Sequence, residues 1–260
     1  MKSIATAFLA LIVCSCSSRV QTNRYETLSY DLVPQTRSLL IENTNGNVKV
    51  TSMAADHKLN IDIDFFARAI SEEESQRLLS EMSVVLDYAE GNVAKLIVKG
   101  PTDNCGANLT VQLPHSLNLD IRNVNGNVDV VPKAKAVSVR NVNGNVAINC
   151  DNKVRAKTTN GNIVVDGNTN DFDLRTSNGN ISLNLSDVFN GSGSMTATNG
   201  NLRIHSSSLI DAKIMGEVEN GDYMIYGPKL YESQGAGLLR LETINGNINV
   251  THVEVAVEVE

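Results

Sequence analysis

The sequence predicts an all-β protein: a β-solenoid or β-helix-like stack of 17–25-residue repeats, with one short helix near the N-terminus. Asparagine is abundant, with 31 in 260 residues, and 20 of these lie between positions 101 and 200. The tripeptide Asn-Gly-Asn, or once Asn-Gly-Asp, occurs eight times, and apolar residues alternate on both sides of each copy. The alternative is an antiparallel sandwich or meander of Asn-Gly hairpins, because hairpins would show the same alternation.

Each repeat is predicted to be a strand, an Asn-Gly turn and a second strand. The residues three and five positions after the first asparagine are apolar in all eight copies, as expected for strands with one buried face. Glycine permits positive φ, so Asn-Gly favours a sharp turn. The turn residues are Asn45, Gly46, Asn125, Gly126, Asn143, Gly144, Asn160, Gly161, Asn178, Gly179, Asn199, Gly200, Asn220, Gly221, Asn245 and Gly246.

A column of mostly polar residues lies two positions before each turn, on the face predicted to point inward. If repeats stack about 4.8 Å apart, these side chains can bond to their equivalents as a ladder. A buried polar group without a partner would cost about 1–3 kcal/mol. The column therefore favours the solenoid, in which each repeat rests on its neighbours. It consists of Asn43, Asn123, Asn141, Thr158, Thr176, Ala197, Val218 and Thr243.

The N-terminus is predicted to be a targeting segment. Lys2 precedes an apolar run that is too short to span a membrane as a mature helix. The run ends in Val-Cys-Ser-Cys-Ser, which resembles a bacterial lipobox, so residues 1–15 would be a lipoprotein signal peptide and Cys16 the lipidated residue. Ser17 favours outer-membrane sorting by the same resemblance, with the body on the periplasmic or the surface side. Residues 16–35 would form a polar tether; a plain secretory signal is the alternative.

Residues 36–116 are predicted to form an N-terminal β region, and residues 117–260 the Asn-Gly-Asn repeat region. Within the first, apolar residues alternate from Leu59 to Phe65, and Ser71 opens a capping box for a helix over 71–83. Residues 93–98 and 109–113 are further predicted strands. At the other end, valines at 253–259 alternate mainly with glutamates, which would discourage edge-to-edge association of a last strand.

Besides Cys16, the predicted mature chain contains two cysteines, Cys105 and Cys150. In an oxidising envelope they can form a disulfide, which would contribute up to about 4 kcal/mol. Spacing does not show whether they approach each other, so both states stay open. No metal site is expected, because no CxxC motif is present and His57, His115, His205 and His252 are scattered.

Composition and motifs argue against several classes of activity. A net charge of −7 and 4% aromatic residues give no footprint for nucleic acid. Neither a nucleophile elbow nor a phosphate-binding loop occurs, so we expect no catalytic residue and no cofactor. The acidic pairs Asp62/Asp64 and Asp171/Asp173 share a strand face, but a glycosidase pair must converge in a cleft. Solvated strand faces account for both pairs better.

One outward column is basic in four successive repeats. It lies three positions before the turn and contains Arg122, Arg140, Lys157 and Arg175. Neighbouring like charges about 5 Å apart are unfavourable unless something neutralises them. Asp120 in the adjacent column would neutralise them only in part, as would Asp173. This basic strip is predicted to bind an anionic polymer or glycan; a solvated face is the alternative.

The repeated pattern Asn-Gly-Asn/Asp-hydrophobic-x-hydrophobic, the early acidic helix and the Leu113-Pro114 step before the repeats together resemble the bacterial DUF4097-type "putative adhesin" family over about residues 36–255. The resemblance implies an envelope β-repeat protein without an assigned activity. The expected function is therefore a non-enzymatic envelope lipoprotein with an adhesin-like scaffold, whose partners are the membrane and an envelope polysaccharide or protein. A polysaccharide-processing β-helix enzyme is one rival, and a periplasmic regulatory module of a membrane signalling system is another.

Overall fold

The computed structural model describes residues 19–53, 58–89, 92–114, 117–131, 134–227 and 237–252. Within them the fold is nearly all β, with one helix, α1 (Glu72–Ser80). The predicted lipidation site Cys16 and the predicted strand at 253–259 lie outside the described residues. The strands are β1 (Val20–Asp31), β2 (Ser38–Asn45), β3 (Val48–Met53), β4 (Lys58–Ala69), β5 (Ser83–Ala89), β6 (Val93–Lys99), β7 (Cys105–Pro114), β8 (Asn118–Asn125), β9 (Val128–Val131), β10 (Ala136–Arg140), β11 (Val146–Asn149), β12 (Lys153–Asn160), β13 (Ile163–Asp166), β14 (Asp171–Asn178), β15 (Ile181–Leu185), β16 (Ser192–Asn199), β17 (Leu202–Ser206), β18 (Ala212–Asn220), β19 (Tyr223–Tyr226), β20 (Gly237–Asn245) and β21 (Ile248–His252).

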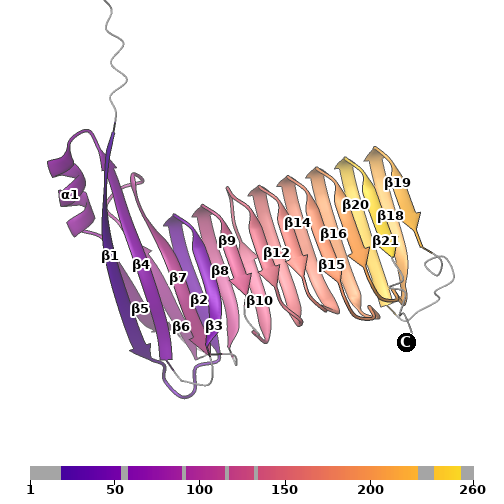
Figure 1. The fold of residues 1–260 in the computed structure, drawn as a ribbon, viewed down its shortest axis with the longest axis horizontal. Coiled ribbons are helices and arrows are strands. Elements are labelled where there is room, and N and C mark those ends of the chain that lie inside the picture. The colour runs from indigo at the N-terminus through magenta and orange to yellow at the C-terminus, as the bar shows by residue number, and fades with distance from the viewer. Residues whose placement is uncertain are drawn as a thin grey trace, which may run out of the picture.

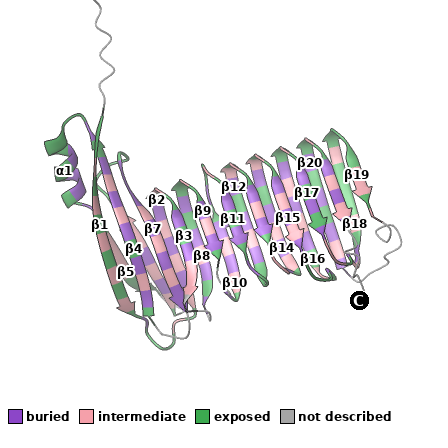
Figure 2. Cartoon of the chain, in the orientation of Figure 1, coloured by how far each residue is buried: buried purple, intermediate pink, exposed green. Residues whose placement is uncertain are grey.

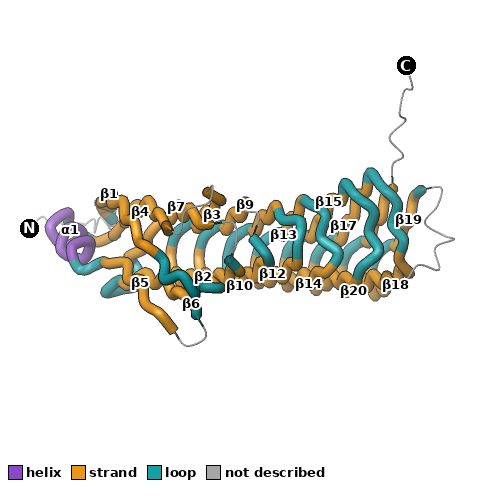
Figure 3. The backbone as a smooth tube through the Cα atoms, turned by 90° about the horizontal axis from the view of Figure 1, so that it is seen from below, coloured by secondary structure: helices purple, strands orange, loops and turns teal. Residues whose placement is uncertain are grey.

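The strands form two large mixed sheets that face each other along an elongated body (Figure 1). In the described residues the eleven-stranded sheet has the order β1-β4-β7-β3-β9-β11-β13-β15-β17-β21-β19, and the ten-stranded sheet β18-β20-β16-β14-β12-β10-β8-β2-β6-β5. Seen at a right angle, the two layers are joined by loops that cross between them at each repeat (Figure 3). Helix α1 lies at one end of the body.

Each repeat contributes one strand to each sheet. The strand before the Asn-Gly turn joins the ten-stranded sheet, and the strand after it joins the eleven-stranded sheet. Neighbouring repeats pair in parallel, as Val137 with Val154 and Val146 with Ile163. Because the two strands that flank each of these turns lie in different sheets, they do not pair with each other as an antiparallel hairpin.

The order of the repeats in space differs from their order in the sequence. Strands β20 and β21 lie between β16/β17 and β18/β19, so the repeat of residues 212–226 is the outermost of the described repeats. At the other end β2 and β3 pair with β8 and β9. The 80-residue gap after the first turn is therefore an insertion at that end, which contributes β4, α1, β5, β6 and β7.

Residues 20–31 are not a tether, which corrects the prediction for residues 16–35. They form β1, which pairs antiparallel with β4 from Val20 opposite Ala69 to Asp31 opposite Lys58. The side chains of β1 alternate between exposed and half-buried. Polar cross-strand bonds add to the pairing: Thr27 donates to Asp62 over 2.8 Å, and Asn23 to Asp64 over 2.8 Å. The sequence predicts a polar tether here because the half-buried face of β1 contains few apolar residues.

Helix α1 begins as predicted and ends earlier. The Ser71 hydroxyl accepts a hydrogen bond from the Glu74 backbone N–H over 3.2 Å, the first half of a capping box. The helix ends at Ser80, not at 83, because Met82 is buried in the core and Ser83 starts β5. Leu78 and Leu79 point into the core.

The core lies between the two sheets and follows the predicted alternation (Figure 2). Fourteen of the sixteen apolar positions after the turns are buried. The two others, Tyr223 and Ile225, belong to the outermost repeat, and Tyr223 is 40% exposed. The core is thus shared between repeats, and each repeat is buried by its neighbours.

Stacking is fixed at the turns by a different ladder from the one predicted. The inward asparagines and threonines do not bond to one another; they donate to the carbonyl oxygens of the turn glycines. Asn141 Nδ2 contacts the Gly126 and Gly144 oxygens, each over 3.0 Å. Thr176 Oγ1 contacts the Gly161 oxygen, also over 3.0 Å.

The ladder between equivalent side chains is formed by the turn asparagines themselves. Asn160 Nδ2 donates to Asn143 Oδ1 over 2.8 Å, and Asn178 Nδ2 to Asn160 Oδ1 over 2.9 Å. The second asparagine of each motif accepts a backbone N–H of the next repeat, as Asn145 Oδ1 does from Asn162 over 2.9 Å. These bonds hold successive repeats in exact register, and that register aligns their outward side chains.

Candidate functional site

The basic strip lies on the outer face of the ten-stranded sheet. Arg140 is the register partner of Arg122 on one side and of Lys157 on the other, and Lys157 is the partner of Arg175. Neighbouring strands are about 4.8 Å apart. The structure thus places the four predicted cations in one row across β8, β10, β12 and β14.

The two ends of the strip are neutralised by carboxylates. Arg122 lies 3.3 Å from Glu42 and 3.4 Å from Asp120. Arg175 Nε donates to Asp173 over 2.8 Å, and this bond raises the pKa of the Arg175 guanidinium. The ends of the strip are therefore internal ion pairs.

The two middle cations are uncompensated. Among the described residues, neither Arg140 nor Lys157 has a carboxylate oxygen within 4.0 Å, and both side chains are exposed. They are nearest neighbours in the row, so each raises the electrostatic cost of the other. An anion bound here would relieve that repulsion.

A shallow groove of about 330 Å³ runs beside the uncompensated pair. Arg155 also lines it, one row further from the turns, and sequence reasoning did not assign it to the site. Its guanidinium donates to Asp171 over 2.6 Å, and Lys153 contacts the other oxygen of that carboxylate over 2.9 Å. The signal for Arg155 was its place two residues before Lys157, on the same face of one strand. The residues lining the groove are Ser138, Val139, Arg140, Arg155, Ala156, Lys157, Asp173 and Arg175.

The same row changes sign toward the outermost repeat. It continues from Arg175 through Thr196 to Glu242 and then Glu217. Strand β20 lies between β16 and β18. Glu242 therefore lies closer to Arg175 in the row than Glu217 does, which is the reverse of their order in the sequence. An anionic polymer would meet attraction along the middle of this face and repulsion at its end.

The acidic pairs do not have the geometry of a catalytic acid and base. The ammonium of Lys153, followed by the guanidinium of Arg155, holds the pKa of Asp171 below its usual range. A general acid needs a raised pKa, whereas this carboxylate is an ion-pair partner on an open sheet face. Asp62 and Asp64 accept bonds from β1 and support strand pairing.

The histidines do not converge on a site in the described part of the chain. His205 and His252 lie on β17 and at the end of β21, and no group of three or more His, Cys, Asp or Glu side chains there could hold a metal ion. His57 and His115 lie outside the described residues. No described helix is long and apolar enough to cross a membrane.

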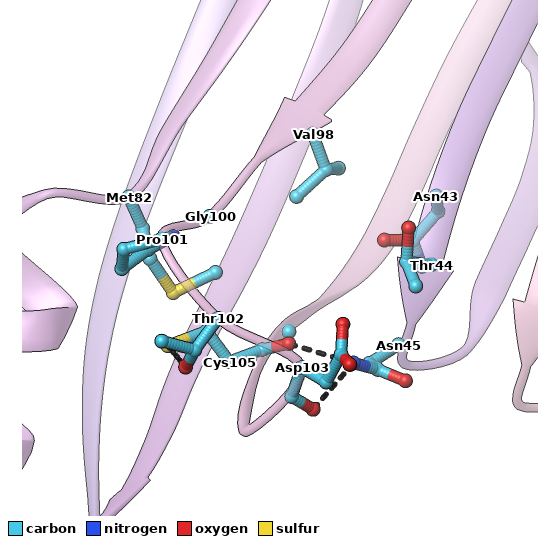
Figure 4. Close-up of a pocket in the computed structure, with 11 residues that line it drawn as sticks. Asn43, Thr44, Asn45, Met82, Val98, Gly100, Pro101, Thr102, Asp103 and Cys105 are labelled. Atoms are coloured by element: carbon cyan, nitrogen blue, oxygen red, sulfur yellow. Dashed lines mark hydrogen bonds between the residues drawn. The ribbon is translucent and has the colours of Figure 1, made fainter.

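Cys105 and Cys150 are both buried and free, and they form no disulfide with each other. Cys105 lies beside the first turn, where Asn45 Nδ2 donates to its carbonyl oxygen over 2.9 Å (Figure 4). Cys150 follows β11, at the end of that strand away from its turn, with its thiol 3.8 Å from the Ala134 oxygen. Cys105 therefore lies at the edge of the eleven-stranded sheet that holds the turns, and Cys150 lies at the opposite edge. A strand length separates the two thiols, which is too far for a disulfide.

We expect the mature chain with Cys16→Ser to take up two alkyl groups when it is unfolded in iodoacetamide without reductant. In the folded chain Cys150 should react slowly, because burial shields the thiol and raises its pKa. Mass spectrometry of the intact protein measures both results. An unfolded, unreduced chain that takes up no alkyl group would contradict the free thiols.

Three solved structures are similar to this chain at low sequence identity. A "putative cell adhesion protein" from Clostridium sporogenes is 11% identical with a TM-score of 0.37, over 88% of this chain and 100% of that chain. A "putative adhesin" from Bacteroides fragilis is 14% identical with a TM-score of 0.43, and one from Parabacteroides distasonis is 11% identical with a TM-score of 0.44; each match covers 88% of this chain and 97% of the other. No protein-family model and no curated protein matches the chain.

Proposed function

We propose that this chain is a non-enzymatic, lipid-anchored cell-envelope protein whose β-repeat body is a solenoid that binds an anionic envelope polysaccharide along the basic strip. The β-repeat body is an adhesin-like scaffold. A lipid on Cys16 anchors this scaffold to the membrane, and Ser17 directs the chain to the outer membrane. The observation that carries the proposal is the uncompensated pair Arg140 and Lys157 beside an open groove.

The shape of the strip favours a linear ligand over a small molecule. The groove is shallow and bounded by a flat sheet, whereas small-molecule sites bury most of their ligand. A polymer can contact several cations in succession, and linked weak contacts raise the overall affinity. The regular spacing of the strands places these contacts along a straight line.

The parallel pairing supports the solenoid part of the proposal. Each repeat passes once through each sheet and pairs in parallel with its neighbours in space, and in the turn column the glycine of one repeat stacks on that of the next. In such stacks each repeat gains most of its stability from its two neighbours. A rigid straight face is the expected product.

Reversing the charge of the uncompensated pair tests the function. We expect the double variant Arg140→Glu/Lys157→Glu to bind a purified, uronate-containing envelope polysaccharide at least about tenfold more weakly, which corresponds to about 1.4 kcal/mol. Titration calorimetry at low and high salt measures the affinity, and added salt should weaken binding by the parent chain more than binding by the variant.

The matched control is Lys49→Glu/Arg203→Glu. It makes the same charge change at exposed positions on strands of the eleven-stranded sheet. This control should bind as the parent chain does, and circular dichroism should show that both variants are folded. Equal loss of affinity in both variants would show that net charge, and not the basic strip, determines binding. Unchanged affinity of the strip variant would refute the proposed ligand.

A further inference from the structure

A polar cavity of about 450 Å³ opens at the N-terminal end of the row of turns. Strand β1, the end of β4, the start of β7 and the first two turns contribute its walls. We call it the corner pocket. The residues that line it include Arg19, Gln21, Asn47, Phe66, Arg68 and Asp103.

Two guanidinium groups line the corner pocket and keep free donors. Arg68 lies over the ring of Phe66, with 5.3 Å from the guanidinium carbon to the ring centroid, and its Nε donates to Gln21 over 2.8 Å. Arg19 Nη1 donates to Asn104 over 2.8 Å. A guanidinium has five N–H donors, and among the described residues the remaining donors of both arginines have no partner. The stacked and bonded Arg68 is held in place for an incoming anion.

A carboxylate lines the same pocket. The Asp103 backbone oxygen accepts from Asn45 Nδ2 over 2.9 Å, which fixes the loop, and no ion pair to its side chain forms within the described residues. The pocket therefore presents two cations and one anion. A ligand carrying a phosphate alone would face the carboxylate, whereas one carrying a phosphate and an ammonium group would pair with both signs.

The corner pocket also lies close to the predicted lipid anchor. Strand β1 starts at Val20, and only residues 17–19 lie between Cys16 and this strand in the sequence. Four extended residues reach at most roughly 14 Å. If Cys16 carries the lipid, the pocket is held at the headgroup layer of the bilayer, and this step rests on the anchoring part of the proposed function.

Apolar side chains beside the pocket suit the same location. Ile70 is 75% exposed and follows Ala69, the register partner of Val20, which is itself 37% exposed. Isolated exposed apolar side chains are common on proteins, but these two lie at the root of the anchor. Contact with the upper acyl region would cover them.

We infer that the corner pocket binds the zwitterionic headgroup of a phospholipid in the leaflet that holds the anchor. Arg68 and Arg19 bind the phosphate oxygens, and Asp103 binds the ammonium group. One bound headgroup, together with the short anchor segment, would fix the direction in which the body leaves the membrane.

The test uses the mature chain with Cys16→Ser, titrated with soluble dihexanoyl phosphatidylethanolamine and followed by amide chemical shifts. We expect Arg68→Gln to weaken binding about tenfold, because it removes the fixed guanidinium. Arg203→Gln, which removes an exposed arginine from β17, should not change it. Equal affinity of the parent chain and Arg68→Gln would overturn the inference.

Two further arms identify the ligand chemistry. Asp103→Asn should weaken phosphatidylethanolamine binding and leave binding of dihexanoyl phosphatidylglycerol unchanged or stronger. Inorganic phosphate that bound the parent chain as tightly as phosphatidylethanolamine would show a simple anion site and overturn the inference. Lipid attachment at Cys16 is measured separately, from the mass of the N-terminal peptide of the membrane form, so failure of the anchor and failure of the pocket are distinguishable.

Discussion

Replacing Gly144 with alanine is expected to lower the free energy of unfolding by about 3 kcal/mol or more. Gly144 has φ +137°, a conformation that favours glycine. A Cβ built there would lie 2.2 Å from the Gly126 carbonyl oxygen of the preceding repeat. Because that atom is backbone and the repeats are bonded on both sides, relief requires the two repeats to separate.

Gly100→Ala is the matched control. Gly100 does not have a positive φ, and its nearest neighbour would be the Cys105 Cβ at 3.3 Å. We expect a change of no more than about 1 kcal/mol. Urea unfolding of both variants gives the comparison, and a Gly144→Ala chain as stable as the control would contradict the close stacking of the turns.

Removing the Phe65 ring is expected to cost about 3–5 kcal/mol. The ring is fully buried on the inward face of β4, the strand next to the edge strand β1. The Arg24 guanidinium lies 4.6 Å from its centroid and donates to the Leu79 and Met82 carbonyl oxygens. Phe65→Ala would therefore leave a cavity and loosen the contact of β1 with the segment after α1.

Phe66→Ala provides the comparison at the adjacent position. Its side chain is on the other face of β4 and half-buried, where it stacks with Arg68. We expect a loss of about 1 kcal/mol, from partial burial and the cation–π contact. Thermal unfolding distinguishes the two variants; similar losses would show that the inward and outward faces of β4 are misassigned.

The repeat itself could be predicted from the sequence because its restraints are local. Alternation after each turn identifies the inward face, and Asn-Gly fixes the chain reversal. The partners of the inward polar column could not be predicted in this way. Side-chain spacing allows Asn141 to bond either to its equivalents or to the Gly126 oxygen, and only the backbone path shows which is nearer.

The spatial order of the last repeats could not be read from the sequence. Most repeat columns carry similar residue types in several copies, so the sequence does not show that Leu241 lies between Met195 and Gly216. The position of β1 could not be predicted from the sequence for a related reason. Its pairing with β4 depends on backbone hydrogen bonds and polar cross-strand contacts, which produce no periodic pattern of apolar residues.

Part of the candidate site could be predicted from the sequence. The basic row depends on the repeat register, so Arg140 and Lys157 could be placed side by side. The neutralisation of Arg122 could be anticipated from Asp120 but not from Glu42, which comes from the distant first repeat. The corner pocket was not predicted, because its walls come from segments brought together by the insertion.

The most direct test of the stacked architecture is the deletion of residues 161–178. Asn178 is the equivalent of Asn160 in the next repeat, and Gly179 follows Asn178. The deletion joins Asn160 to Gly179, so it removes one complete repeat and restores an Asn-Gly turn. We predict a folded chain with a single cooperative urea transition, because the flanking repeats present matching columns to each other. Deleting residues 161–169 removes half a repeat and should prevent folding. A whole-repeat deletion that is as unfolded as the half-repeat deletion would contradict the stack.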